Sequence, residues 1–198
     1  MSYFPMYINI KNEDRVLLIG GGNVALQKLK VLKKNDIKVH LVAKQVDLSI
    51  YDYLSEYADF DDTDSSGDIE IGEYNKSFLN DDYSFVIAAT DDRQLNARIA
   101  ADSKEKNIPV NVVDDPELST FIFPSIIKKG NLVIGISSSG KAPAVTQYYK
   151  ARFEEQIPDN IDEILEELGQ YRNQIKNDVR NHKKRAEMIR ERFLELIS

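Results

Sequence analysis

The chain has 198 residues, of which 42% are hydrophobic, and a formal net charge of −7 at pH 7. This length and composition predict one large folded domain, or one domain with a small appendage, and exclude disorder throughout. The lack of cysteine excludes disulfides and thiolate sites. The acidic balance argues against nucleic acid as a partner. No stretch predicts a leader peptide or a membrane span, and we expect a cytoplasmic protein.

The first half of the sequence alternates short apolar runs with helical patterns. Arg15–Ile19 and Val39–Ala43 are partly β-branched runs typical of buried parallel strands, and Val24–Lys34 between them predicts a helix. Strand, helix and strand fit within about 30 residues, the size of one βαβ unit. Residues 59–68, rich in aspartate and serine, predict an exposed loop.

The alternation continues with two more predicted strands, Phe85–Thr90 and Val110–Val113, and a helix at Leu95–Lys106 between them. Alternation of this kind implies a mostly parallel sheet covered by helices. The fold class that we predict is therefore α/β, of the Rossmann type.

Beyond Pro116 the pattern changes. Two apolar runs, at 121–127 and 132–137, flank Lys128–Asn131 and predict a β-hairpin. From Ala144 onward, apolar residues recur at steps of three and four, which predicts a C-terminal helical region.

A glycine-rich turn joins the first predicted strand to the helix that follows. Gly20, Gly22 and Ala25 satisfy the G-x-G-x-x-G/A pattern of dinucleotide-binding folds. Gly20 permits a tight turn, Gly22 lets the backbone approach a pyrophosphate, and Ala25 lets helix and strand pack closely. The alternative is a turn that binds nothing; the strand-turn-helix context favours binding.

The acidic residue that usually follows about 20 positions later, and binds the ribose hydroxyls, is absent from the end of the second predicted strand. Lys44 and Gln45 stand there, and Asp47 comes slightly later. Lys44 could bind a 2′-phosphate or be a solvated surface lysine. The spacing therefore leaves open whether NAD or NADP is preferred.

Asp114 is the candidate acid or base. It follows an apolar strand, and open α/β sheets place their ligands beyond the carboxyl ends of their strands. Partial burial there would suit it to proton transfer. Asp115 precedes a proline and is interpreted as a turn residue. His40, inside a strand, and His182, on a basic helix, are interpreted as structural or solvated.

A second candidate site lies between the hairpin and the helical region. Ser137–Pro143 contains three serines, Gly140 and Lys141 immediately before a predicted helix. Hydroxyl and N–H groups at a helix start can hold a carboxylate or a phosphate. Ordinary helix capping explains the same residues about equally well.

Taken together, several segments between residues 4 and 143 resemble the siroheme synthase N-terminal family, the precorrin-2 dehydrogenases, some of which are also sirohydrochlorin ferrochelatases. This combination is far more specific than the glycine pattern alone. There are two departures: Lys28 stands where arginine is commoner, and Ala142 where serine is frequent. The matching segments are Phe4–Tyr7, Gly20–Ala25 with Lys28, Ala88–Asp92, Asn111–Pro116, Phe121–Ser125 and Ser137–Pro143.

The resemblance implies NAD as the cofactor, precorrin-2 as the substrate and Asp114 as the residue that serves dehydrogenation and, where present, metal chelation. The residues expected to contact the cofactor are Gly20, Gly22, Asn23, Val24, Lys44, Gln45, Thr90 and Asp91. Those expected near the tetrapyrrole are Ser138, Gly140 and Lys141.

The resemblance also implies a homodimer with three parts. These are an NAD-binding Rossmann domain at residues 1–114, a dimerisation region built from the hairpin at 115–143 and a C-terminal helical region at 144–198. The apolar hairpin itself predicts a symmetric dimer, because its strands would otherwise leave bare edges.

Three functions stay open. The leading one is NAD-dependent oxidation of precorrin-2 to sirohydrochlorin, with hydride passing to the nicotinamide while Asp114 removes a proton. The second adds insertion of Fe²⁺ into sirohydrochlorin, although no His/Cys cluster predicts a preformed metal site. The third is a non-enzymatic NAD-sensing module, which the glycine pattern fits equally well. The segment around Asp114 favours an enzyme.

Overall fold

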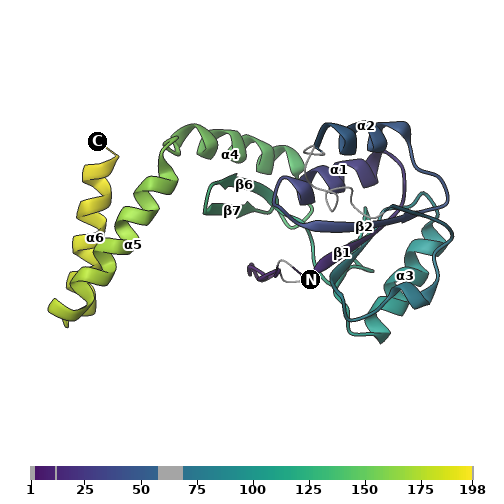
Figure 1. Ribbon diagram of the computed structural model, residues 1–198, viewed down its shortest axis with the longest axis horizontal. Helices are drawn as coiled ribbons and strands as arrows, with labels where there is room; N and C mark the ends of the chain where they lie inside the picture. The colour runs from purple at the N-terminus through teal and green to yellow at the C-terminus, as the bar shows by residue number, and fades with distance from the viewer. Residues whose placement is uncertain (1–2, 12, 58–68, 198) are drawn as a thin grey trace. The chain divides into compact units, whose positions relative to one another are not determined.

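A computed structural model of the protein describes residues 3–11, 13–57 and 69–197. The loop predicted at 59–68 lies outside these residues. The chain divides into two compact units, drawn in Figure 1: one spans Met6–Phe123, and the other begins at Pro124 and includes the first residues of the chain. The dimerisation role expected for 115–143 stays a prediction.

The first unit is built on a five-stranded parallel sheet with the order β3-β2-β1-β4-β5. Successive strands run outward from β1 in one direction and then, from β4, in the other. Sheets with this order bind their ligands beyond the carboxyl ends of the strands where the order reverses, here β1 and β4. The strands are Arg15–Ile19 (β1), Lys38–Ala43 (β2), Ile69–Ile71 (β3), Tyr83–Ala88 (β4) and Val110–Val112 (β5).

Helices cover both faces of this sheet, as Figure 1 shows: α1 (Asn23–Lys33) and α2 (Leu48–Tyr57) pack on one face, and α3 (Arg93–Glu105) packs on the other. Strand β1 serves both cores, because successive side chains of a strand point to opposite faces. Leu18 contributes to the α1 and α2 side and Leu17 to the α3 side, and both are fully buried. The predicted α/β fold of the Rossmann type is confirmed.

The second unit contains an antiparallel hairpin and three helices. The hairpin is tied to α4 by a hydrogen bond from Ser125 Oγ to Thr146 Oγ1 (2.9 Å), and α6 is tied to α5 by Arg192 Nε, which donates to Glu167 Oε1 (3.0 Å). The elements are β6 (Ser125–Lys129), β7 (Leu132–Ile136), α4 (Pro143–Gln156), α5 (Ile161–Asp178) and α6 (His182–Leu196).

The first strand of the hairpin begins at Ser125 and not, as predicted, at Phe121. The rings of Phe121 and Phe123 pack edge-on against Phe85 of β4, with centroids 5.1 and 6.0 Å apart. The apolar run is therefore shared between two cores: its aromatic half belongs to the Rossmann sheet, and only the rest forms a strand.

Helix α2, strand β3 and a short 3-10 helix at Lys76–Phe78 (η1) were not predicted from the sequence. The strands and helices that were predicted for the first unit are confirmed, and their observed ends differ from the predicted ends by at most two residues. Within the described residues, no helix has both the length and the hydropathy that crossing a membrane would require.

Candidate functional site

The glycine turn between β1 and α1 is closely surrounded on one side and open on the other. Gly20 has a φ of 135°, and a Cβ added there would lie 2.2 Å from the carbonyl oxygen of Ala89. A Cβ added at Gly21 would lie 2.0 Å from the carbonyl oxygen of Gln45. At Gly22 the same test finds no atom within 4 Å. The turn is thus pressed against the ends of β2 and β4 and opens at Gly22.

Gly21 has a structural role in the turn that the sequence pattern misses, because G-x-G leaves its middle position variable. Its backbone also holds the neighbouring loop, since its carbonyl accepts a hydrogen bond from the N–H of Asp47 (2.8 Å). The available signal was the unbroken run of three glycines.

The N-terminus of α1 presents backbone N–H groups that have no acceptor within the helix. Gly22 is the N-cap residue and provides no side-chain cap, and the first turn contains no acidic residue. The first intrahelical bond is donated by Leu26 N–H to the carbonyl of Gly22 (3.0 Å). The N–H groups of Asn23 and Val24 precede it and have no partner within the helix. N–H groups of this kind, together with the positive end of the helix dipole, suit phosphate groups, and the cofactor contacts predicted for Gly22, Asn23 and Val24 stay a prediction.

The other two helices of this unit begin differently. The Asp92 carboxylate caps α3 by accepting hydrogen bonds from the N–H groups of Gln94 (2.9 Å) and Leu95 (3.1 Å). Before α2, Asp47 accepts from the N–H of Ser49 (2.9 Å). An acidic side chain thus occupies both helix starts. Of the three helices of this unit, α1 is the one whose start carries no acidic cap.

Thr90 follows β4 at the same edge of the sheet. Its hydroxyl donates to Asn96 Oδ1 (2.7 Å), and the Asn96 amide donates back to the Thr90 carbonyl (2.9 Å). Asn96 is buried, and this pair fixes the end of β4. Asp91, the next residue, is exposed.

Lys44 and Gln45 follow β2, and both side chains are exposed to solvent. The Lys44 ammonium pairs with Glu73, at 3.0 Å between Nζ and Oε1. Glu73 follows β3, the neighbouring parallel strand, so that its carboxylate lies at the same edge of the sheet. This acidic residue was not predicted, because it comes from a different strand.

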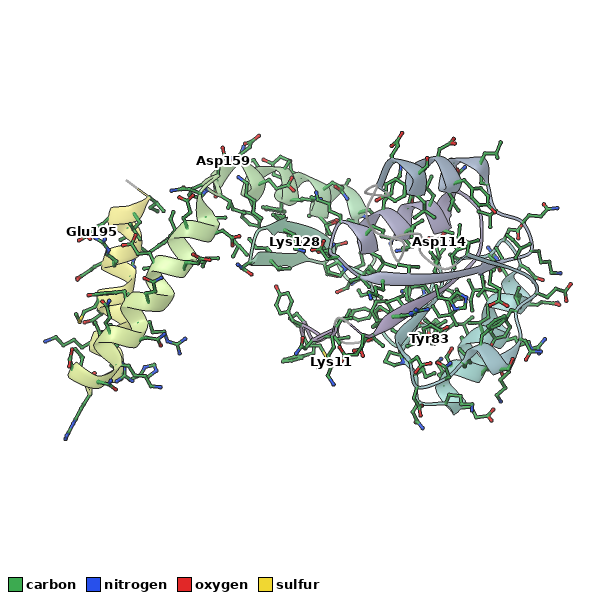
Figure 2. The ribbon with its side chains drawn as sticks, in the orientation of Figure 1. Lys11, Tyr83, Asp114, Lys128, Asp159 and Glu195 are labelled. Carbon is green, nitrogen blue, oxygen red and sulfur yellow. The ribbon has the colours of Figure 1, made fainter. Side chains whose placement is uncertain are left out.

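Asp114 lies just beyond β5, as Figure 2 shows. The N–H of Val113 still donates to the carbonyl of Ala88 (3.0 Å), and the chain then turns at Asp114 with a φ of 60°. Aspartate is among the few residues that tolerate this left-handed conformation. The side chain is exposed in the single chain, and the partial burial expected from the sequence is not found. The turn carries it past the edge of the sheet, where the described elements of this unit leave it exposed.

Lys28 of α1 is a charged group that interacts electrostatically with Asp114. Its ammonium lies 4.6 Å from the centroid of the Phe123 ring, in the cluster that Phe123 forms with Phe85 and Phe121. Burial lowers the pKa of Lys28, and the negative charge of Asp114 partly offsets this effect. A half-buried cation is therefore held near the candidate catalytic carboxylate.

Asp115 and His40 have structural roles, as the sequence predicted. Asp115 accepts a hydrogen bond from the N–H of Leu118 (3.1 Å) and closes the turn after β5. The His40 ring is held between the Tyr83 hydroxyl and the Glu70 carboxylate, the latter at 3.3 Å. Tyr83, labelled in Figure 2, begins β4 and so lies at the sheet edge opposite to Asp114.

The loop at Ser137–Pro143 belongs to the second unit. Ser138 uses its side chain within the loop, because Oγ accepts from the N–H of Ala142 (3.0 Å). Gly140, with a φ of 77°, and Lys141 are exposed. Contact between these residues and a tetrapyrrole stays a prediction. The part of the chain that the structure describes contains no group of three or more His, Cys, Asp or Glu side chains placed to hold a metal ion.

The strand order, the close glycine turn and the uncapped N-terminus of α1 define a dinucleotide-binding domain of the Rossmann type. The chain belongs to the family described as "Putative NAD(P)-binding", whose sequence model matches residues 6–125. The expected cofactor is thereby confirmed as NAD(P), and the donors of α1 fit its pyrophosphate.

Curated relatives agree with the motif resemblance. The siroheme synthase of Psychrobacter cryohalolentis is 40% identical over 165 residues, which are 83% of this chain and 29% of the relative. That of Azotobacter vinelandii is 39% identical over 158 residues, covering 80% of this chain and 32% of the relative. The chain thus spans about a third of the length of these relatives. The resemblance to the N-terminal part of siroheme synthases is confirmed.

A solved structure named "SirC, precorrin-2 dehydrogenase" has the same fold. The superposition has a TM-score of 0.58 and covers 97% of this chain and 98% of that chain, at 19% sequence identity. At this identity the likeness shows the fold.

Proposed function

We propose that this chain is an oxidoreductase that converts precorrin-2 to sirohydrochlorin with NAD. The observation that carries the proposal is the position of Asp114, an exposed carboxylate at the sheet edge that holds the glycine turn. The siroheme synthase relatives and the fold of a precorrin-2 dehydrogenase support the choice of substrate.

The oxidation removes a hydride and a proton from the macrocycle. When bound, the dinucleotide supplies the acceptor for the hydride. In this chain the first turn of α1 binds the pyrophosphate, and the Thr90–Asn96 pair holds the end of β4 in place. Asp114 accepts the proton. Lys28 keeps a positive charge near that carboxylate from the side of α1. The contribution of the protein is thus mainly orientation and proton transfer.

An absorbance assay with precorrin-2 and NAD tests the proposal directly. We expect NADH and sirohydrochlorin to form together in equal amounts, and neither to form when precorrin-2 or NAD is left out. NAD binding without any turnover would contradict the proposal and favour the alternative of an NAD-sensing module.

Iron insertion is the second candidate function, favoured by the name siroheme synthase that the relatives carry. Insertion of Fe²⁺ requires the loss of two pyrrole protons, for which an exposed carboxylate such as Asp114 is a suitable acceptor. Sirohydrochlorin and Fe²⁺, supplied without NAD, test it: the metallated product should form faster with the protein than without it. Equal rates would exclude this activity.

We also propose a symmetric homodimer formed through the second unit. The support is apolar surface on α4, where Val145 is 49% exposed, Tyr148 58% and Tyr149 47%, and on β7, where Val133 is 36% exposed. Large apolar side chains that lie together on a surface are typical of protein interfaces.

A further inference from the structure

The ends of β2 and β3 bring two opposite charges together. The strands are parallel and in register, with Ala43 opposite Ile71. The pairing continues one step further, because the N–H of Gly72 donates to the carbonyl of Ala43 (2.9 Å). Lys44 follows Ala43 beyond β2 and Glu73 follows Gly72 beyond β3, and their Nζ and Oε1 atoms are 3.0 Å apart.

The end of β2 has a known role in dinucleotide-binding folds. The end of β2 faces the ribose of the adenosine half, where an acidic residue binds the 2′-hydroxyl of NAD and a basic residue accommodates the 2′-phosphate of NADP. Here β2 provides a lysine, and the carboxylate comes from the neighbouring strand. We propose that Glu73 is the residue that sets cofactor preference: it accepts a hydrogen bond from the ribose of NAD and, by holding Lys44, discriminates against NADP.

Other carboxylates near the end of β2 are engaged elsewhere. Asp47 Oδ1 accepts hydrogen bonds from both the N–H (2.9 Å) and the hydroxyl (2.6 Å) of Ser49, and these bonds lower the pKa of Asp47. Glu70 pairs with the His40 ring within the sheet. Among the described residues of this edge, Glu73 is the carboxylate whose partner is the lysine at the ribose position.

The discrimination follows from charge. A 2′-phosphate adds about 1.5 to 2 negative charges at neutral pH. Lys44 alone would attract it, but Glu73 cancels that attraction and repels the phosphate. A ribose hydroxyl is neutral and finds an acceptor in the same carboxylate. Because both side chains are largely exposed, the pair contributes little to folding stability, and its role is selection between ligands.

Calorimetric titration of the whole chain with NAD and with NADP tests this inference. The parent should bind NAD at least about 10-fold more tightly than NADP, the scale of one good charge or hydrogen-bond contact. E73Q should lose most of this ratio, mainly by gaining affinity for NADP. Adding K44M to E73Q should remove the gained affinity, because the phosphate then has no cation to bind.

E70Q is the matched control, since it neutralises a carboxylate of β3 that pairs with His40 and not with Lys44. Its ratio should equal that of the parent. A parental ratio in E73Q, or a parent that prefers NADP, overturns the inference. So does a parent that binds neither dinucleotide. No tetrapyrrole is used, so failure of the proposed oxidation leaves this test intact. A parental ratio in E73Q leaves the oxidation standing, whereas a parent that binds neither dinucleotide removes the NAD-dependent oxidation as well.

Discussion

The left-handed backbone of Asp114 makes one substitution especially informative. Asparagine tolerates a φ of 60° as well as aspartate does, so that Asp114→Asn should leave the turn intact while removing the base. We expect the rate of precorrin-2 oxidation to fall by about 10²- to 10⁴-fold, the usual contribution of a general base, with NAD affinity unchanged by calorimetry.

Asp115→Asn is the control for this variant. The amide oxygen of asparagine can still accept the hydrogen bond from the N–H of Leu118, so turnover should change little. Near-parental oxidation by Asp114→Asn would show that Asp114 is not the proton acceptor, even though the family assignment would stand.

Lys28 links stability to pH in a direction that can be measured. Burial holds its pKa in the folded protein below the ordinary value of 10.5, so between these two values the unfolded chain binds more protons. The free energy of unfolding should therefore rise with pH across this window. In Lys28→Met that rise should be missing, as measured by urea denaturation from neutral pH up to about 10.5.

Lys30→Met provides the comparison on the same helix. The Lys30 ammonium also lies over a ring, 5.3 Å from the centroid of Tyr53, but the side chain is exposed. Its substitution should leave the pH dependence like that of the parent. A Lys28→Met variant with the parental slope would mean that this lysine is solvated in the folded protein.

At the scale of elements, the uncapped start of α1 predicts that a new acidic cap, Gly22→Asp, will raise the stability of the protein and abolish its binding of NAD. Gly22 has φ −102° and ψ −169°, an extended conformation that suits an N-cap residue, and a side chain there meets no atom. Gly22→Asp should therefore cap α1 and stabilise the free protein by a few tenths to about 1 kcal/mol. The same carboxylate would occupy the phosphate site and abolish NAD binding.

Thermal melting and calorimetry with NAD measure the two effects. Gly21→Ala makes the contrast, because its Cβ would press on the carbonyl of Gln45. That variant should lose about 1–3 kcal/mol of stability, as overpacked sites do. Loss of NAD binding in Gly22→Asp together with a lower melting temperature would argue for misfolding of the turn and against occupation of the phosphate site.

How far the sequence predicts an element depends on whether its signal is local. Strand β1 is a run of apolar residues on both faces, and α1 follows a glycine turn, so both were predictable. Helix α2 buries Ile50, Tyr53 and Leu54 at helical spacing, but its other aromatic residues obscure the pattern. Strand β3 has three residues, too few for alternation to be detected.

The parts of the site that were missed depend on contacts between distant residues. Gly21 must be glycine because of Gln45, which lies just beyond β2, and Glu73 reaches Lys44 from the segment after β3. Likewise, Phe121 belongs to the Rossmann core only because β4 presents Phe85 to it. No local pattern contains such pairs. They become visible only when the strand order is known.

At the scale of the whole molecule, the proposed homodimer makes the exposed face of α4 a site for disruption. Val145→Glu should weaken association, because burying a charge without a partner opposes an apolar interface. Sedimentation at micromolar concentration should show a parent dimer and a variant shifted toward monomer. Val31→Glu, on an exposed position of α1 in the first unit, should remain a dimer. A parent that sediments as a monomer with normal activity would contradict the proposal.

The free helix end at Gly22 also has a consequence for the life of the protein in a cell. A ligand that binds only the folded chain raises its stability by RT ln(1 + [L]/Kd), about 2.7 kcal/mol when the ligand is at 100 times its Kd. Proteases remove unfolded chains continuously, and stability changes of 1–2 kcal/mol can alter abundance several-fold. A cell short of dinucleotide would therefore hold fewer copies of this protein at an unchanged rate of synthesis. If the pyrophosphate binds at the start of α1 as proposed, the lifetime of the chain would depend on the supply of its cofactor.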